Sequence, residues 1–105
     1  MPQVMVYMKI IDARGERIVA ICDEDLLGKR FSEKGLVLHI NKDFYGEELV
    51  PIDYAMSIAS TATVLNLVGR NTVDEAIKRG YIHPEAVIEI SGIPHAQAIK
   101  MPEKY

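Results

Sequence analysis

The sequence predicts an α+β fold: a single small domain, residues 1–105, with a mostly antiparallel sheet of about five strands covered by one long and one short helix. Three observations support this prediction. Near both ends of the chain, apolar residues occur at every second position, which predicts strands. In a central part they occur at spacings of three and four, which predicts a helix. Strands and helices are thus segregated along the chain, which is typical of α+β domains. The length suits one domain.

The N-terminal part predicts a hairpin. Val4 to Ile11 alternates in its side-chain direction, and both of its faces are apolar, so we expect this strand in the interior of the sheet. Asp12 to Gly15 is a turn signal, and Gly15 suits the left-handed position of a bulged hairpin. Arg17 to Cys22 then returns as the second strand.

The next segment contains mainly short elements. Asp23 to Gly28 predicts one helical turn, which Asp23 would cap and Gly28 would end. Lys29 to Lys34 is interpreted as a charged connection. Leu36 to Ile40 predicts the third strand, and Asn41 to Val50 a loop.

The longest uncharged part of the chain predicts the main helix, Pro51 to Val68. Its apolar stripe consists of residues at helical spacing, and Gly69 would end the helix. The members of the stripe are Ala55, Ile58, Ala62 and Leu65, widened by Met56 and Ala59.

A second, shorter helix is predicted after Gly69. Thr72 and Glu75 have the spacing of a capping box, in which each side chain bonds the other residue's backbone N–H. Gly80 would end this helix. Two further strands are expected at Ala86 to Ile90 and His95 to Met101, and we expect residues 102–105 to form a loose tail.

The composition limits the classes of function. The formal net charge is −3, so no global positive field attracts nucleic acid or an anionic membrane. A single cysteine, Cys22, excludes a disulfide within the chain and fits a reducing compartment. No signal peptide or membrane-spanning run is evident. We therefore expect a soluble, cytoplasmic protein without membrane association.

Cys22 is the candidate for a nucleophilic cysteine. A helix that starts directly after it would favour the thiolate, but three neighbouring acidic residues oppose it. Cys22 is also in phase with Ile18 and Ala20, which favours a buried, unreactive thiol. The three histidines are widely spaced and no second cysteine is present, so we predict no metal site. No cofactor motif is found either.

A Gly-Pro segment near the C-terminus is a candidate binding loop. Glycine and proline would fix its backbone, while three polar side chains could point toward a ligand or partner. The alternative is a rigid turn whose polar groups bond its own backbone. The residues of this candidate loop are Ser91, Gly92, Pro94, His95 and Gln97.

Basic and aromatic residues are interleaved in the middle of the chain, a pattern typical of proteins that bind single-stranded nucleic acid. Lys29, Arg30 and Lys34 are the candidate phosphate contacts, and Tyr45 a candidate stacking residue. Nearby acids dilute the positive charge. Arg70, at the start of a predicted helix, is a candidate anion contact, with a simple capped loop as the alternative.

Four segments together resemble an archaeal family of small proteins, the "domain of unknown function 424" family. They are Cys22 to Lys29, Phe44 to Gly46, Asn66 to Gly69 and Gly92 to Gln97. The sequence departs from the family pattern at Phe44 to Glu48, where a second glycine is expected. The resemblance implies an archaeal cytoplasmic protein and carries no assigned activity, cofactor or catalytic residue.

Three hypotheses about function follow. The first is a non-enzymatic binding module for RNA or a ribonucleoprotein, which would use the basic-aromatic segment and the Gly-Pro loop. The second is an enzyme that uses Cys22 and His95, which must then lie within hydrogen-bond reach. The third is a homodimeric interaction protein, because Val4 to Ile11 and the uncharged helix are more apolar than so small a domain readily covers.

Overall fold

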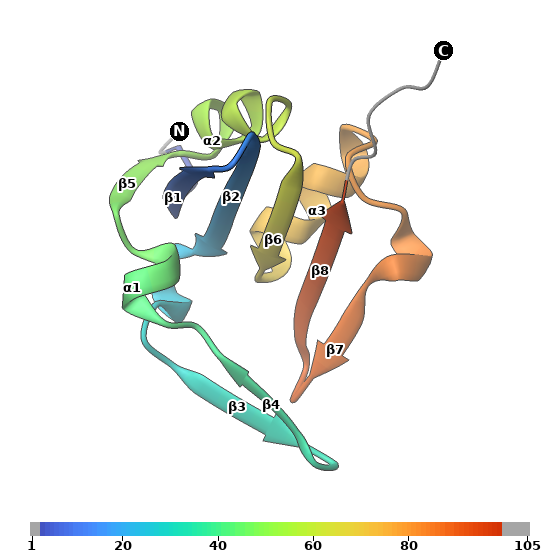
Figure 1. Ribbon diagram of the computed structural model, residues 1–105. Coiled ribbons are helices and arrows are strands. Elements are labelled where there is room, and N and C mark those ends of the chain that lie inside the picture. The colour runs from blue at the N-terminus through green and yellow to red at the C-terminus, as the bar shows by residue number, and fades with distance from the viewer. Residues whose placement is uncertain (1–2, 100–105) are drawn as a thin grey trace.

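The computed structural model describes residues 3–99 as an α+β domain with a mixed six-stranded sheet and a separate two-stranded sheet (Figure 1). The strand order of the large sheet is β5-β1-β2-β6-β8-β7, and β3 pairs with β4. Three α-helices and two short 3₁₀ turns complete this part of the chain. In chain order the elements are β1 (Met5–Ala13), β2 (Glu16–Asp23), η1 (Glu24–Leu26), β3 (Arg30–Glu33), β4 (Leu36–His39), α1 (Lys42–Tyr45), β5 (Glu48–Pro51), α2 (Ile52–Ala59), β6 (Val64–Val68), α3 (Arg70–Lys78), η2 (Pro84–Ala86), β7 (Ile88–Ile90) and β8 (Ile93–Ile99).

The α+β class is confirmed, whereas the expected five strands and two helices differ from the structure. The predicted hairpin is present as β1 and β2, and β1 lies between β5 and β2, so its two apolar faces match an interior position. β2 and β6 are parallel, and the remaining pairs of the large sheet are antiparallel. The expected loose tail, Pro102 to Tyr105, lies outside the described residues.

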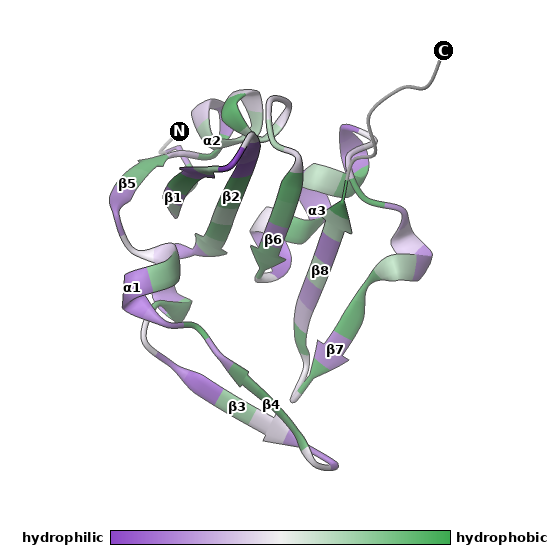
Figure 2. Ribbon diagram, viewed as in Figure 1, coloured by the Kyte–Doolittle hydropathy of each residue, from purple (hydrophilic) through white to green (hydrophobic). Residues whose placement is uncertain are grey.

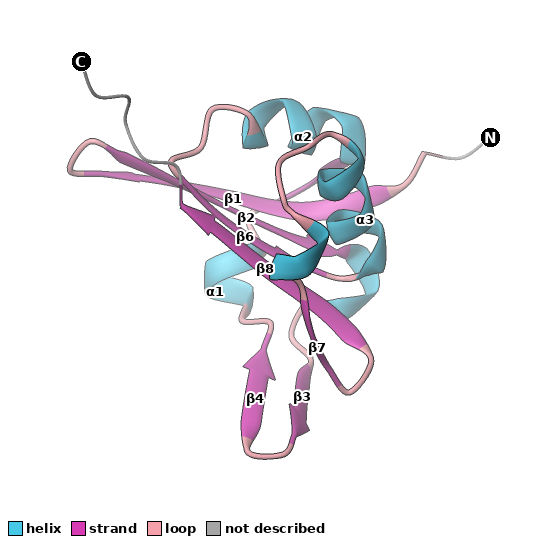
Figure 3. Cartoon of the chain, turned by 90° about the vertical axis from the view of Figure 1, so that its right-hand side faces the viewer, coloured by secondary structure: helices cyan, strands magenta, loops and turns pink. Residues whose placement is uncertain are grey.

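One face of the large sheet is covered by α2 and α3 (Figure 3). Alternate residues of the strands point to this face and meet the apolar sides of the two helices, which forms the main core. Because Ala55 and Ala59 are small and fully buried, α2 packs closely on the sheet. The buried members of the main core are Val6, Met8, Val19, Ile21, Val50, Ala55, Met56, Ala59, Ala62, Leu65, Leu67, Val73, Ala76, Ile82 and Ala96.

The opposite face of the sheet is covered only in part, by η1, α1 and the β3–β4 hairpin (Figure 3). A second, smaller core lies there, and its buried members are Ala20, Cys22, Leu26, Leu38, Ile40, Tyr45, Val68 and Ile90. Further along this face, four apolar residues form a row across neighbouring strands: Ile11 of β1, Ile18 of β2, Val64 of β6 and Ile99 of β8. In this last row Ile11, Ile18 and Val64 are partly exposed, and Ile99 is 70% exposed.

The predicted long helix, Pro51 to Val68, is wrong in its second half. α2 ends at Ala59, and residues 64–68 form the interior strand β6. At the end of the helix the hydroxyl of Ser57 donates to the carbonyl of Tyr54, at 2.7 Å, and that of Thr61 donates to the carbonyl of Ile58, also at 2.7 Å. Side-chain bonds of this kind compete with continuation of the helix.

The segment between β2 and α2 is more ordered than predicted. Lys29 to Lys34, interpreted as a connection, contains the strand β3, which pairs with β4 from Arg30 opposite His39 to Glu33 opposite Leu36. The predicted loop Asn41 to Val50 contains α1 and most of the edge strand β5. Asn41 caps α1, because its side chain accepts the backbone N–H of Asp43 at 2.7 Å.

Three hairpins of the structure share one kind of turn. Each has two residues, a non-glycine and then a glycine, both with positive φ, as in the type I′ turn that suits twisted strands. The pairs are Arg14-Gly15, with φ of 54° and 80°, Lys34-Gly35, with 50° and 84°, and Ser91-Gly92, with 52° and 79°. The first hairpin therefore has no bulge, contrary to the prediction.

Asp23 has a different role from the predicted one. Its carboxylate does not cap η1. It accepts instead the backbone N–H groups of Asn71, at 3.1 Å, and Thr72, at 2.9 Å, together with the hydroxyl of Thr72 at 2.7 Å. Asp23 thus caps the N-terminus of α3 from the end of β2. The predicted capping box is wrong, because Thr72 lies inside the helix and Glu75 pairs with Arg79.

Candidate functional site

The β3–β4 hairpin extends away from the large sheet and is the main projection of the molecule (Figures 1 and 3). Figure 2 shows β3 as largely hydrophilic and β4 as largely hydrophobic. Phe31 and Leu38 face one another across the hairpin and pack into the smaller core, which joins the hairpin to the rest of the domain. At its tip, Leu36 is 55% and Val37 59% exposed.

Cations gather on this hairpin. Lys29, Arg30 and Lys34 are exposed, and Lys42, at the start of α1, lies against Gly28, where a Cβ would meet its Cε at 3.0 Å. Within residues 3–99 none of these four side chains has an ion-pair partner. His39 is also exposed and is paired with Arg30 in the β3–β4 ladder. We call Lys29, Arg30, Lys34 and Lys42 together the hairpin cation group.

Two of the candidate nucleic-acid contacts lie apart from this group. Tyr45 is 5% exposed, and its burial raises the pKa of the phenol, so its ring is not available for stacking in this conformation. Phe31 and Phe44 also pack on the smaller core. Arg70 begins α3, on the other face of the sheet, and lies 3.7 Å from Glu89.

The candidate binding loop is a tight turn followed by a strand. Only Ser91 and Gly92 form the turn, while Pro94, His95 and Gln97 belong to β8. The polar groups of Ser91 are used within the chain: its N–H donates to Glu33 at 2.7 Å and its hydroxyl to the carbonyl of Ser32 at 2.7 Å. The turn therefore fastens the β3–β4 hairpin to the end of the large sheet.

His95 and Gln97 lie on the partly covered face of the sheet. The side-chain amide of Gln97 donates to Oδ1 of the buried Asn66 at 2.7 Å, directly across the β6–β8 ladder. His95 is half-buried, and this burial lowers the pKa of its imidazole from the usual 6.5. A hollow of about 170 Å³ lies beside the two residues, between β8 and the end of η2.

Cys22 and His95 do not form an activated pair. Val68 lies between them in the sheet, opposite both, so two strand spacings, or about 10 Å, separate their backbones. Burial, followed by the charges of Asp23 and Asp25, raises the pKa of Cys22 to about 12. A nucleophilic cysteine needs the opposite shift. The expected burial of Cys22 is confirmed.

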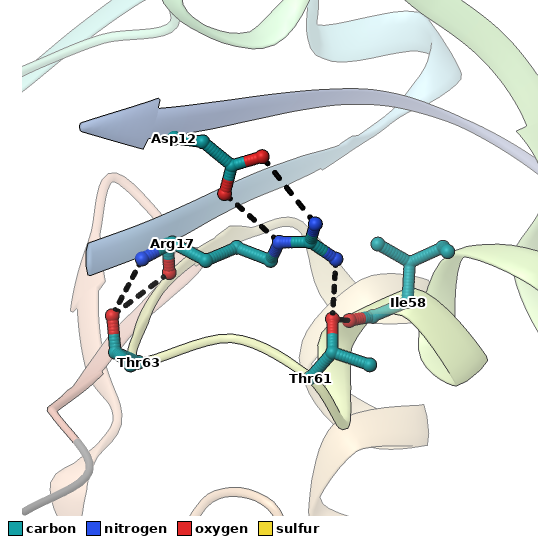
Figure 4. Close-up of polar contacts among 5 residues, drawn as sticks. All are labelled: Asp12, Arg17, Ile58, Thr61 and Thr63. Carbon is teal, nitrogen blue, oxygen red and sulfur yellow. Dashed lines mark hydrogen bonds and ion pairs between the residues drawn. The ribbon is translucent and has the colours of Figure 1, made fainter. Parts of the chain in front are cut away.

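Arg17 holds together the turn between β1 and β2 and the loop between α2 and β6 (Figure 4). Its guanidinium donates to Asp12 at 2.9 and 3.3 Å and to the hydroxyl of Thr61 at 3.0 Å. The hydroxyl of Thr63 accepts the N–H of Arg17 at 2.8 Å and donates to its carbonyl at 3.1 Å. Because these groups are bonded to one another, the network sets the start of β6 against β2.

A hollow of about 640 Å³ lies where β2 ends and α3 begins, beside Tyr7, Glu24, Asp25 and Asn71. The positive end of α3 is already occupied by Asp23. Among residues 3–99, no three side chains of His, Cys, Asp or Glu are grouped as metal ligands. In the same part of the chain no helix has the length and apolar character needed to cross a membrane.

Comparisons with known proteins show which family the chain belongs to. A solved structure described as an uncharacterized conserved protein from Methanopyrus kandleri is similar over 96% of each chain, with a TM-score of 0.83 and 26% sequence identity. No curated protein matches the chain. The sequence pattern of the family "Protein of unknown function (DUF424)" matches residues 11–101, which is most of the chain. The protein therefore belongs to the DUF424 family, as the four sequence segments indicated.

Proposed function

We propose that this protein is a non-enzymatic binding module that contacts RNA, free or within a ribonucleoprotein, through its β3–β4 hairpin. The observation that carries the proposal is the hairpin cation group: Lys29, Arg30, Lys34 and Lys42 are exposed and without ion-pair partners in residues 3–99. Most other cations among residues 3–99 are bonded within the domain. Arg17, Lys78 and Arg79, for example, each pair with a carboxylate.

The arrangement of the hairpin favours contact with a phosphate backbone. Phe31 and Leu38 pack in the smaller core and hold the two strands in place, and the four cations are exposed on this projecting hairpin and on the neighbouring start of α1. Unpaired cations attract phosphate because binding releases the counterions that surround the nucleic acid. The chain is acidic overall, with a net charge of −3, so this attraction is confined to the hairpin.

The aromatic residues next to the hairpin do not support base stacking in this conformation, since Tyr45 is buried and Phe31 and Phe44 pack on the smaller core. We therefore infer that recognition depends on phosphate contacts and on the shape of the RNA rather than on its base sequence. The exposed Leu36 and Val37 at the hairpin tip add an apolar contact next to the cations.

The test is RNA binding, measured by fluorescence anisotropy with a labelled stem-loop RNA over a series of salt concentrations. Each phosphate contact contributes a slope of about −0.7 to −0.9 in a plot of log K against log salt. Replacing Lys29, Arg30 and Lys42 by glutamine should weaken binding and reduce this slope by roughly 2 to 3.

A matched control is available in the chain. Arg14 and Lys34 are both exposed cations at the first position of the same two-residue turn with a following glycine. Lys34→Gln should weaken binding and Arg14→Gln should leave it unchanged. Equal effects of the two substitutions, or binding that does not respond to salt, would contradict the proposal, as would the absence of binding at micromolar protein.

A further inference from the structure

The large sheet has an incompletely paired edge. β7 covers β8 only from Ile93 to His95, with Ile88 opposite His95 as its last pair. β8 continues to Ile99, and its other side is paired with β6 along the whole of His95 to Ile99. Beyond His95, β8 is therefore an edge strand of the described part of the chain. An edge strand presents unpaired backbone groups that can accept another strand.

The direction of these backbone groups follows from one hydrogen bond. Alternate residues of an antiparallel strand direct both their N–H and their C=O to the same neighbour. The carbonyl of Pro94 accepts the N–H of Gly69 at 2.9 Å, so Pro94, Ala96 and Ala98 face β6. The N–H and C=O of Gln97 and Ile99 therefore point away from the sheet, and residues 3–99 supply no backbone partner for them.

We propose that two copies of this protein associate through this edge, with β8 of one copy paired antiparallel to β8 of the other. Gln97 of each copy lies opposite Ile99 of the other, and Ala98 lies on the two-fold axis. In this register the outward N–H groups of one strand meet the outward C=O groups of the other, because hydrogen-bonded pairs alternate in an antiparallel ladder. The two six-stranded sheets become one continuous sheet.

Three features of the edge favour a second copy as the occupant. The two outward residues are two positions apart, so the pattern is complementary to itself under two-fold symmetry. Ile93 to Ile99 contains no Lys, Arg, Asp or Glu, so two copies bring no such like charges together and the edge lacks the lysines that commonly block pairing. Ile99 is 70% exposed and would lie diagonally across the axis from its counterpart.

The test is the molar mass in solution, measured by light scattering and sedimentation from about 10 μM to about 1 mM, the weak range expected for a small interface. The wild-type protein should form dimers as concentration rises. Ile99→Lys should shift the dissociation constant at least about tenfold toward the monomer. Val37→Lys is the matched control, because Val37 is also an exposed β-branched strand residue, at 59%, but lies at the hairpin tip.

Hydrogen exchange separates this interface from other modes of association. The amides of Gln97 and Ile99 should gain protection as concentration rises, whereas those of Ala96 and Ala98, bonded to β6, should be protected at every concentration. The latter two amides also show whether Ile99→Lys remains folded. A wild-type monomer at the highest concentration, a dimer unaffected by Ile99→Lys, or unchanged exchange at Gln97 and Ile99 would overturn the proposal.

Discussion

Gly69 is the position where a single methyl group should be most costly. Its backbone has φ 107° and ψ 153°, a region that is essentially restricted to glycine and costs other residues about 1–3 kcal/mol. A Cβ at this position would also lie 2.3 Å from Cγ and 2.6 Å from both carboxylate oxygens of Asp23. Gly69→Ala therefore strains the backbone and displaces the cap of α3.

The expected loss combines these two effects. Removing a helix cap costs about 1 kcal/mol, up to about 2, and a buried carboxylate left without its donors adds about 1–3 kcal/mol. We expect Gly69→Ala to lower the free energy of unfolding by at least about 3 kcal/mol, and Tm by at least roughly 12 °C for a chain of this size. Thermal and urea unfolding, followed by circular dichroism, measure both quantities.

Gly35→Ala is the matched control. Gly35 also has a positive φ, 84°, but nothing lies within 4 Å of the added Cβ, so only backbone strain of about 1–2 kcal/mol is expected. In an Asp23→Ala background the cost of Gly69→Ala should fall toward that of backbone strain alone, with a coupling of at least about 1 kcal/mol. Equal losses for Gly69→Ala and Gly35→Ala, or strict additivity with Asp23→Ala, would refute the reasoning.

The raised pKa of Cys22 and the lowered pKa of His95 predict opposite dependences of stability on pH. The Cys22 thiol keeps its proton in the folded state while the unfolded chain loses it above pH 9.0, so the stability falls between pH 9 and 12 by up to about 1.4 kcal/mol per unit. Cys22→Val should make this fall shallower in urea unfolding; an unchanged slope would contradict the burial of the thiol. His95 binds its proton less readily in the folded state than in the unfolded chain. The stability that its neutral imidazole contributes is therefore present above pH 6.5 and is lost as the pH falls below that value. An NMR titration should place the pKa of His95 below 6.5, and His95→Gln should reduce the loss of stability in acid; a midpoint above 6.5 would contradict the prediction.

The candidate site could be predicted in composition but not in geometry. The interleaving of charges and aromatics indicates Lys29, Arg30 and Lys34, but it does not indicate the strand β3, which carries Arg30 and lies between the two lysines. The signal was present in Lys34-Gly35, because a glycine after a polar residue between two short runs is a hairpin turn. Tyr45 could not be assigned from the sequence, since its burial depends on α1 packing against β1 and β2.

The sequence by itself determined the elements whose partners are close along the chain. The β1–β2 hairpin follows from alternation on both sides of one turn, and the position of α3 follows from Gly69 before it and Gly80 after its end, although the predicted capping box is wrong. In both cases the stabilising contacts are local or lie along one periodic face, so the pattern of residues contains the information.

Only the tertiary structure decided the elements whose partners are distant. Apart from Asn66, residues 64–68 are apolar, which fits a buried helix or an interior strand equally well. The parallel pairing with β2, some 45 residues earlier, makes them a strand. Asp23 lies where it would cap the turn after it, yet it caps α3, because the parallel strands β2 and β6 end side by side. The main-chain bonds of an interior strand outweigh local propensity, and they become available only when the sheet is assembled.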